Sequence, residues 1–274
     1  MIQDIYPHKL NNQYDKDAAA SPEDFALCFD GPKLLLKKTP EGLSFPRVGD
    51  FLPGTAGKYL LSVDEQRFFL MPMPEILPEG CEISDVVTLR RTAPMPQHLI
   101  YAAVTGKHLA DWYRDTQYCG RCGSKMGHST TERAMVCPGC GYTAYPRIMP
   151  AVIVGVTNGN KILITRYRVG YGHNALIAGF TEIGETLEET VAREVMEEAG
   201  VRVKNIRYYK SQPWGFANDI LMGFYCDVDG DTEIHMDNQE LKQAGWVERE
   251  QIELQPDNFS LTNEMMEKFK NGEI

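Results

Sequence analysis

The chain has 274 residues, 43% of them hydrophobic and 24% charged, a length that suits about two domains of roughly 150 residues each. Its formal charge of −10 argues against a basic nucleic-acid coat protein. The first residues lack the pattern of a secretion signal, and we find no apolar run long enough for a membrane span. Seven cysteines are too few for a disulfide scaffold, so we expect a reducing, cytoplasmic setting.

Short apolar runs separated by Gly and Pro fill the first third of the chain, which predicts a small, mostly β domain over residues 1–93. These runs include residues 34–36, 59–61 and 68–70. Residues 97–114 contain no Pro and carry apolar residues at helical spacing. They predict either one helix or two helical pieces broken at Gly106, inside a connector over residues 94–116.

Four cysteines form two C-x2-C pairs that are separated by 14 residues: Cys119, Cys122, Cys137 and Cys140. A glycine follows each pair and lets the backbone turn toward sulfur. Four thiolates suit a tetrahedral zinc and leave no position open for water, so we predict a structural zinc in a ribbon over residues 117–145. Rubredoxin-like iron and a redox dithiol are the alternatives. We expect His128 to be a bystander.

The segment from Arg114 to Arg168 is locally positive, with eight Lys and Arg against one Asp and one Glu, a charge of +6. Dispersed charges of this kind are typical of a solvated surface. The functional alternative is attraction of phosphate groups toward a neighbouring site.

Residues 146–274 combine strand and helix patterns and predict a mixed α/β domain. Asn158-Gly159 is a strong hairpin turn between two β-rich runs, and Gly200 ends a helix pattern. The expected elements are β-rich runs at 151–156, 161–165, around 206 and at 221–228, and helices at 186–199 and 260–270.

Three glutamates share one side of the helix expected at 186–199, because Glu194, Glu197 and Glu198 fall within an arc of about 100° at 100° per residue. Their mutual repulsion is unfavourable unless a cation sits there. Crowded oxygen ligands select hard cations such as Mg²⁺ or Mn²⁺, which bridge to substrate phosphates. The simpler interpretation is a solvated acidic face, but Arg193 is placed to orient these carboxylates.

The stretch from Gly179 to Val201 reads Gly, five residues, Glu, seven residues, Arg-Glu, an aliphatic residue, any residue, Glu-Glu, any residue, Gly and an aliphatic residue. This pattern is the Nudix box, and the chain resembles a Nudix hydrolase. The resemblance implies an α/β/α sandwich that hydrolyses a nucleoside diphosphate linked to another moiety. It also implies which groups hold and support the catalytic metals: Glu194, Glu197, Glu198 and the carbonyl of Ala178 as ligands, with Arg193 and Glu185 in support.

A four-cysteine ribbon before this domain is similar to the NADH pyrophosphatase branch of the family, over about residues 109–246. Further motifs agree: Ala110-Asp-Trp-Tyr-Arg, Thr131-Glu-Arg-Ala-Met, Tyr145-Pro-Arg-Ile and the branch marker Ser211-Gln212-Pro213-Trp214. By this resemblance Phe180 and a second subunit's Tyr145 sandwich a nicotinamide ring. The resemblance also assigns the remaining contacts: Glu132, Gln212 and Trp214 to the substrate, and Glu240 to the metal site.

The loop after this marker departs from the family, which continues with Pro-Phe-Pro-x-Ser. This chain reads Gly215-Phe-Ala-Asn-Asp219, with an extra residue before Leu221. Losing two fixed φ angles predicts a more mobile loop, and Asp219 near an anionic substrate would repel it. The altered loop therefore bears on the preference for a dinucleotide substrate. It bears less on the hydrolysis of a pyrophosphate bond.

We expect a Mg²⁺- or Mn²⁺-dependent pyrophosphohydrolase that cleaves NAD(H) to nicotinamide mononucleotide and AMP. Glu198 or Glu240 would be the general base, with Glu197 and Arg193 completing the catalytic set. ADP-ribose, FAD or the NAD cap of an RNA end are alternative substrates, and the +6 segment offers a path for RNA phosphates. A rival of another class is a non-catalytic nucleotide sensor. The family precedent suggests a homodimer, and we expect no membrane partner.

Overall fold

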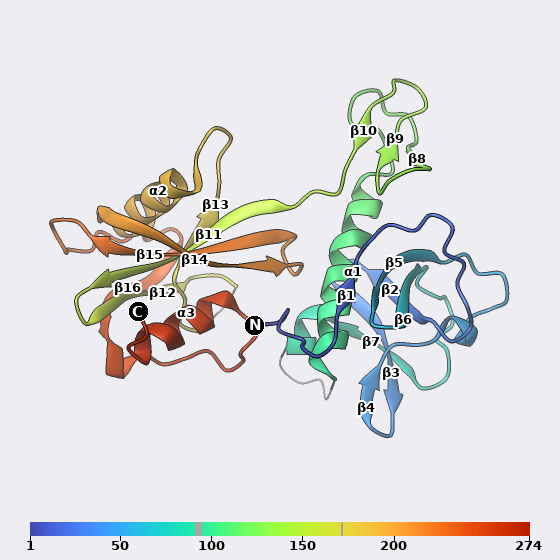
Figure 1. The fold of residues 1–274 in the computed structure, drawn as a ribbon, viewed down its shortest axis with the longest axis horizontal. Coiled ribbons are helices and arrows are strands. Elements are labelled where there is room, and N and C mark those ends of the chain that lie inside the picture. The colour runs from blue at the N-terminus through green and yellow to red at the C-terminus, as the bar shows by residue number, and fades with distance from the viewer. Residues whose placement is uncertain (91–94, 171) are drawn as a thin grey trace. The chain divides into compact units, whose positions relative to one another are not determined.

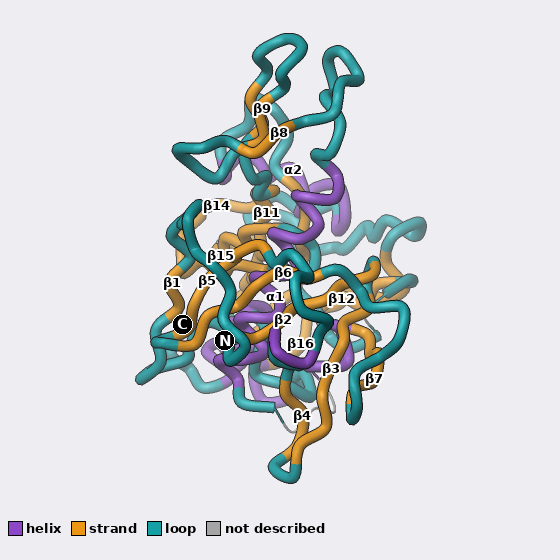
Figure 2. Tube along the Cα trace, turned by 90° about the vertical axis from the view of Figure 1, so that its right-hand side faces the viewer, coloured by secondary structure: helices purple, strands orange, loops and turns teal. Residues whose placement is uncertain are grey.

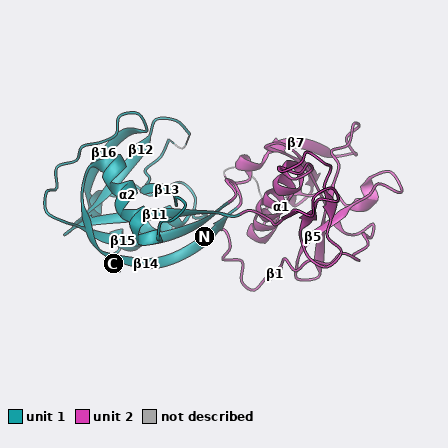
Figure 3. Cartoon of the chain, turned by 90° about the horizontal axis from the view of Figure 1, so that it is seen from above, with its two compact units in different colours: residues 1, 148–214, 219–274 teal, residues 2–147, 215–218 magenta. Residues whose placement is uncertain are grey.

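The computed structural model describes residues 1–90, 95–170 and 172–274. The chain divides into two compact units, shown in different colours in Figure 3. One comprises Ile2–Arg147 and Gly215–Asn218, and the other comprises Met1, Ile148–Trp214 and Asp219–Ile274. The domain boundary expected between residues 93 and 94 lies outside the described residues. None of the described helices is long and apolar enough to cross a membrane.

The first unit is built on a mostly antiparallel sheet (Figure 1). Its strands are β1 (Leu10–Asn11), β2 (Phe25–Asp30), β3 (Lys33–Thr39), β4 (Gly42–Ser44), β5 (Lys58–Val63), β6 (Gln66–Met71) and β7 (Cys81–Asp85), with 3-10 turns at Val48–Asp50 and Val86–Arg90. The order is β1-β5-β6-β2-β3-β4, and β7 also pairs with β3. The three apolar runs expected to be strands lie in β3, β5 and β6, as predicted.

A single helix, α1 (Gln97–Asp115), packs against β2, β5 and β6. Of the two alternatives, the single helix is confirmed, since α1 runs through Gly106 without a break. A Cβ at Gly106 would lie 2.5 Å from Cδ1 of Leu27 in β2, so this glycine permits the helix to approach the sheet closely. Packing outweighs the roughly 1 kcal/mol by which glycine disfavours a helix.

The cysteine segment forms a small three-stranded sheet of order β10-β9-β8. Its strands are β8 (Gly127–His128), β9 (Met135–Val136) and β10 (Thr143–Ala144). Most of the segment is loop, as the colouring of Figure 2 shows. A segment with so few strand residues needs a cross-link between its loops to be stable, and the four cysteines can provide one.

The second unit contains a sheet of order β14-β15-β11-β12-β16, with β13 paired to β11. Its strands are β11 (Met149–Asn158), β12 (Lys161–Tyr167), β13 (Ile177–Phe180), β14 (Val203–Trp214), β15 (Asp219–Val228) and β16 (Leu241–Glu248), followed by a 3-10 turn at Arg249–Gln251. The β11–β12 hairpin predicted at Asn158-Gly159 is confirmed, and Gly159 has the positive φ of +59° that such a turn needs.

Two helices cover opposite faces of this sheet, α2 (Leu187–Ala199) and α3 (Leu261–Lys270). Alternate residues of β11 serve the two faces: Val152 and Val154 pack in a core with α2, while Ile153 packs in another with α3. This arrangement confirms the α/β/α sandwich. The packing of α2 on the sheet therefore sets the position of its acidic residues.

Candidate active site

The sequence of α2 specifies both of its ends. Thr186 accepts a hydrogen bond from the Glu189 amide, and the Glu189 carboxylate accepts one from the Thr186 amide, forming a capping box. Gly200 closes the helix with φ +70°. The helix is thus fixed in length and register, which sets the direction of every glutamate along it.

Arg193 lies at the centre of the acidic cluster, where its guanidinium forms hydrogen bonds with four groups. Nε donates to Oε1 of Glu185 at 2.6 Å, and Nη1 donates to Glu194 at 2.7 Å and to Glu197 at 3.0 Å. Nη2 donates to the Phe180 carbonyl at 2.9 Å, and again to Glu185. These bonds hold the pKa of Glu185 down at about 2. Arg193 therefore orients carboxylates from the loop and from α2, which a solvated acidic face would not require.

Glu198 is the buried member of the cluster, with only 2% of its surface exposed. The Tyr167 hydroxyl donates to both of its oxygens at 3.3 Å. Burial, followed by repulsion from Glu194, raises the pKa of Glu198 to about 8. Burial likewise raises the pKa of Glu194, against the effect of Arg193. Placing such carboxylates together without a cation is unfavourable, so their donor chemistry fits a divalent metal.

Glu240 precedes β16 and is close enough to Glu194 and Glu198 to raise the pKa of both by repulsion. Ala178 in β13 contributes a backbone hydrogen bond that lowers the pKa of Glu198. The predicted metal ligands are therefore gathered by α2, β13 and the residue before β16. Among the described residues, the ligand atoms of the four cysteines lie within 4.8 Å of one another, whereas the carboxylates do not form such a group.

Gly179 in β13 makes this gathering possible, because a Cβ at this position would overlap the carboxyl group of Glu194. We expect Gly179→Ala to displace that carboxylate and to lower kcat about 100-fold, as displacements near 1 Å do in active sites. Gly245→Ala is the matched control, since Gly245 lies in the same sheet with open space around it. Steady-state kinetics beside a melting curve test this, and equal activity of the two variants would contradict it.

Two contacts of the cluster were not predicted from the sequence. Tyr167 at the end of β12 binds Glu198, and the Thr190 hydroxyl donates to Glu185 at 2.9 Å. Tyr167 follows an ordinary β-rich run, so nothing local distinguishes it. Thr190 is buried on α2 and shares a face with Arg193, which could have indicated it.

The four predicted zinc ligands come together. Sγ of Cys119 lies 3.6 Å from that of Cys140, and Sγ of Cys122 lies 3.4 Å from that of Cys137. All four sulfurs lie within 4.8 Å of one another. A tetrahedral zinc with bonds near 2.3 Å needs separations of about 3.8 Å, so the site suits that ion. Hydrogen bonding with Ser124 lowers the pKa of Cys122 to about 6, which favours the thiolate.

The predicted substrate contacts lie in both units. Phe180 is 51% exposed beside the Arg193 cluster, and Tyr145 is 56% exposed in the first unit. The Tyr145 hydroxyl donates to Glu132 at 3.0 Å, which brings two predicted contacts together. Exposed aromatic rings are available for stacking on a flat heterocycle. Their roles toward a substrate remain predictions.

Gln212 and Trp214 lie at the end of β14 and are less exposed than Phe180 and Tyr145. Gln212 is fully buried, donates to the Phe259 carbonyl at 2.7 Å and accepts from the Leu261 amide at 2.7 Å. Trp214 packs partly buried against the core beneath α3. Gln212 therefore anchors the segment before α3, and direct contact with substrate would require these bonds to break.

Asp219 begins β15 opposite Trp214, is 7% exposed, and its Oδ1 has no hydrogen-bond partner among the described residues. Burial raises its pKa to about 6. The fold therefore favours the protonated acid, and stability is lost as pH rises from about 4 through 6. We expect Asp219→Asn to be more stable than wild type by roughly 2–3 kcal/mol at pH 8, with the difference vanishing near pH 4. Urea unfolding at both pH values tests this, and a gap independent of pH would contradict it.

Two family models match the chain. The model described as NUDIX domain matches residues 147–269, and the model described as NADH pyrophosphatase zinc ribbon domain matches residues 114–145. These ranges contain, respectively, the acidic cluster and the four cysteines.

Two similar proteins bear the name NAD-capped RNA hydrolase NudC. One, from Photorhabdus laumondii, is 40% identical over 186 residues, which is 68% of this chain and 72% of the relative. Another, from Yersinia pestis, is 36% identical over 217 residues, covering 79% of this chain and 80% of the relative. A solved NUDIX hydrolase from Nitrosomonas europaea matches with TM-score 0.50 at 23% identity, covering 57% of this chain and 90% of that one, and supports the fold alone.

Proposed function

Because the chain belongs to the Nudix hydrolases that carry an NADH pyrophosphatase zinc ribbon, we propose that it cleaves the diphosphate of NAD(H) to nicotinamide mononucleotide and AMP. The observation that carries this proposal is the Arg193 cluster. One guanidinium orients Glu185, Glu194 and Glu197 beside the buried Glu198, and Gly179 leaves space for the Glu194 carboxyl group. A sensor that only binds nucleotides has no need for this complete set.

Glu194, Glu197, Glu198, Glu240 and the Ala178 carbonyl would hold Mg²⁺ or Mn²⁺. A divalent ion bound there supplies charge neutralisation for the diphosphate and lowers the pKa of an attacking water. The protein's own groups do the remaining work. Arg193 fixes the carboxylates before substrate arrives, so little reorganisation is needed during the reaction. Glu198 or Glu240 accepts the proton of the water.

The NAD cap of an RNA 5′ end is a second candidate substrate, because it contains the same diphosphate bond. The names of the similar proteins and the +6 segment from Arg114 to Arg168 favour it. Nucleotides that follow the cap would bring phosphates to these cations, and such binding weakens as salt rises. ADP-ribose and FAD share the bond but offer no such chain of phosphates.

We also propose that the enzyme acts as a homodimer in the cytoplasm, with a structural zinc in each ribbon. Phe180 and the partner subunit's Tyr145 would stack on the two faces of the nicotinamide ring. Both rings are about half exposed, which leaves their faces accessible. Glu132, bonded to Tyr145, would bind the substrate from the same ribbon.

The test is a competition between NADH and NAD-capped RNA in one reaction with Mn²⁺, at low and high salt. We expect both to be cleaved, and we expect the share of RNA cleavage to fall several-fold at high salt. ADP-ribose and FAD serve as further competitors. Preferential cleavage of either of these would overturn the assignment of NAD as substrate while leaving pyrophosphate hydrolysis intact.

A further inference from the structure

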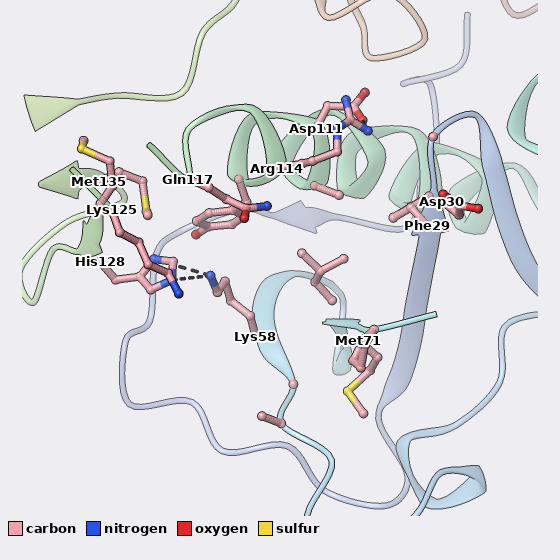
Figure 4. A pocket seen from close by; sticks show the side chains of 18 residues that line it. Phe29, Asp30, Lys58, Met71, Asp111, Arg114, Gln117, Lys125, His128 and Met135 are labelled. Carbon is pink, nitrogen blue, oxygen red and sulfur yellow. Dashed lines mark hydrogen bonds and ion pairs between the residues drawn. The ribbon is translucent and has the colours of Figure 1, made fainter. Parts of the chain in front are cut away.

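The first unit contains a cavity of about 540 Å³, and all the residues that line it belong to that unit. It is walled by the β2 and β5–β6 strands, the end of α1 and the cysteine ribbon (Figure 4). Its volume falls within the range of small-molecule sites, about 300–1,000 Å³. The function proposed above makes no use of it.

Basic groups gather at one end of this cavity. Lys58 Nζ lies 2.6 Å from Nε2 of His128 and 4.0 Å from the centre of the Tyr113 ring. Lys125 extends from the ribbon into the same cavity. No carboxylate pairs with Lys58 or Lys125 within the described ranges of the chain. Burial lowers the pKa of Lys58 to about 8, and burial followed by Lys58 lowers that of His128.

The rest of the lining is mostly apolar, and its polar members are Asp30, Asp111, Arg114 and Gln117. Met126 and Met135 from the ribbon and Met71 from β6 line the walls and are buried. Thioethers and a tyrosine ring pack well against a flat aromatic ring. Asp30 lies away from Lys58 in Figure 4 and offers an acceptor for hydroxyl or amino donors. Asp111, by contrast, is already paired with Lys107 and Arg114.

We propose that this cavity is a binding site for a mononucleotide. The phosphate monoester would bind Lys58, Lys125 and His128, since a dianion needs more than one cation and accepts several charge-assisted hydrogen bonds. The base would lie toward Met71, which Figure 4 shows on the other side of Lys58 from Met135. Ribose hydroxyls or an exocyclic amino group would face Asp30. Binding here involves neither the acidic cluster nor the four cysteines.

The experiment is a titration of the full zinc-loaded chain with AMP, without added Mg²⁺ or Mn²⁺, followed by NMR of ¹³C-labelled methionine methyl groups. We expect saturable shifts at Met126 and Met135, which report this cavity apart from the second unit. Lys58→Met and Lys125→Met, on two different elements, should each weaken binding about tenfold or more. Lys9→Met, at an exposed position outside the cavity, should leave it unchanged.

Adenosine and inorganic phosphate are separate arms, and we expect AMP to bind at least tenfold tighter than either. Equal binding of phosphate would overturn the mononucleotide in favour of a simple anion site. Tighter binding of a 5′-phosphorylated RNA tetranucleotide would assign the cavity to an RNA chain instead. Absence of methyl shifts at 10 mM AMP (about 10⁴ times a typical micromolar Kd), or unaltered affinity in both lysine variants, would refute the proposal.

Discussion

Replacement of Glu198 by Gln is expected to lower kcat for pyrophosphate hydrolysis by about 1,000-fold or more. Glu198 is buried and receives the Tyr167 hydroxyl, and it stands beside Glu194 and Glu240 in the site that would hold the metal. An amide keeps the size of the side chain but removes a charged ligand and a candidate base. Because the carboxylate is buried and repelled by its neighbours, the fold should tolerate the change.

Glu188→Gln is the matched control, since Glu188 is an exposed glutamate in the first turn of the same helix. Its loss should change stability by only a few tenths of a kcal/mol and leave kcat unaltered. Kinetics with NADH and Mn²⁺, beside circular dichroism of both variants, give the comparison. Full activity of Glu198→Gln would remove the acidic cluster from the mechanism.

Replacement of Cys137 by Ser is expected to abolish zinc binding and unfold the ribbon. The four sulfurs lie within 4.8 Å of one another, and the ribbon has only three two-residue strands to hold it otherwise. Structural zinc sites contribute about 10–16 kcal/mol of binding free energy to such folds. We expect metal content, measured by mass spectrometry, to fall from about one zinc per chain to below about 0.1.

Cys81→Ser is the control for this change, because Cys81 lies in β7, outside the four-cysteine group. It should retain the full metal content. The same measurement on wild type distinguishes zinc from the rubredoxin-like iron that similar C-x2-C pairs can bind. Iron in place of zinc, or undiminished zinc in Cys137→Ser, would contradict a structural zinc ribbon.

The parts of the fold predicted well from sequence are those set by short-range chemistry. The turn at Asn158-Gly159 has its own geometry, and the capped helix from Thr186 to Gly200 is specified by residues within it. The order of the first sheet was not predictable, because β2 pairs in parallel with β6 across about forty residues. Whether the helix continues through Gly106 could not be decided from sequence for the same reason, because its neighbour Leu27 is distant in sequence.

The candidate site shows the same division. The spacing of Glu194, Glu197 and Glu198 predicted that they share one side of a helix. The two C-x2-C pairs predicted that the four cysteines come together. Contacts from other elements were not predicted, such as the hydrogen bond from the Tyr167 hydroxyl to Glu198. Asp219 was expected to repel an anionic substrate, which stays a prediction. Its burial at the start of β15, opposite Trp214 across a four-residue connection, was not predicted.

The most direct test of the central claim is identification by mass of what the protein makes from NADH in the presence of Mn²⁺. We expect equal amounts of reduced nicotinamide mononucleotide and AMP from wild type, and neither above background from Glu198→Gln. NADH that is bound and recovered intact would contradict pyrophosphate hydrolysis and would identify the chain as a nucleotide sensor instead.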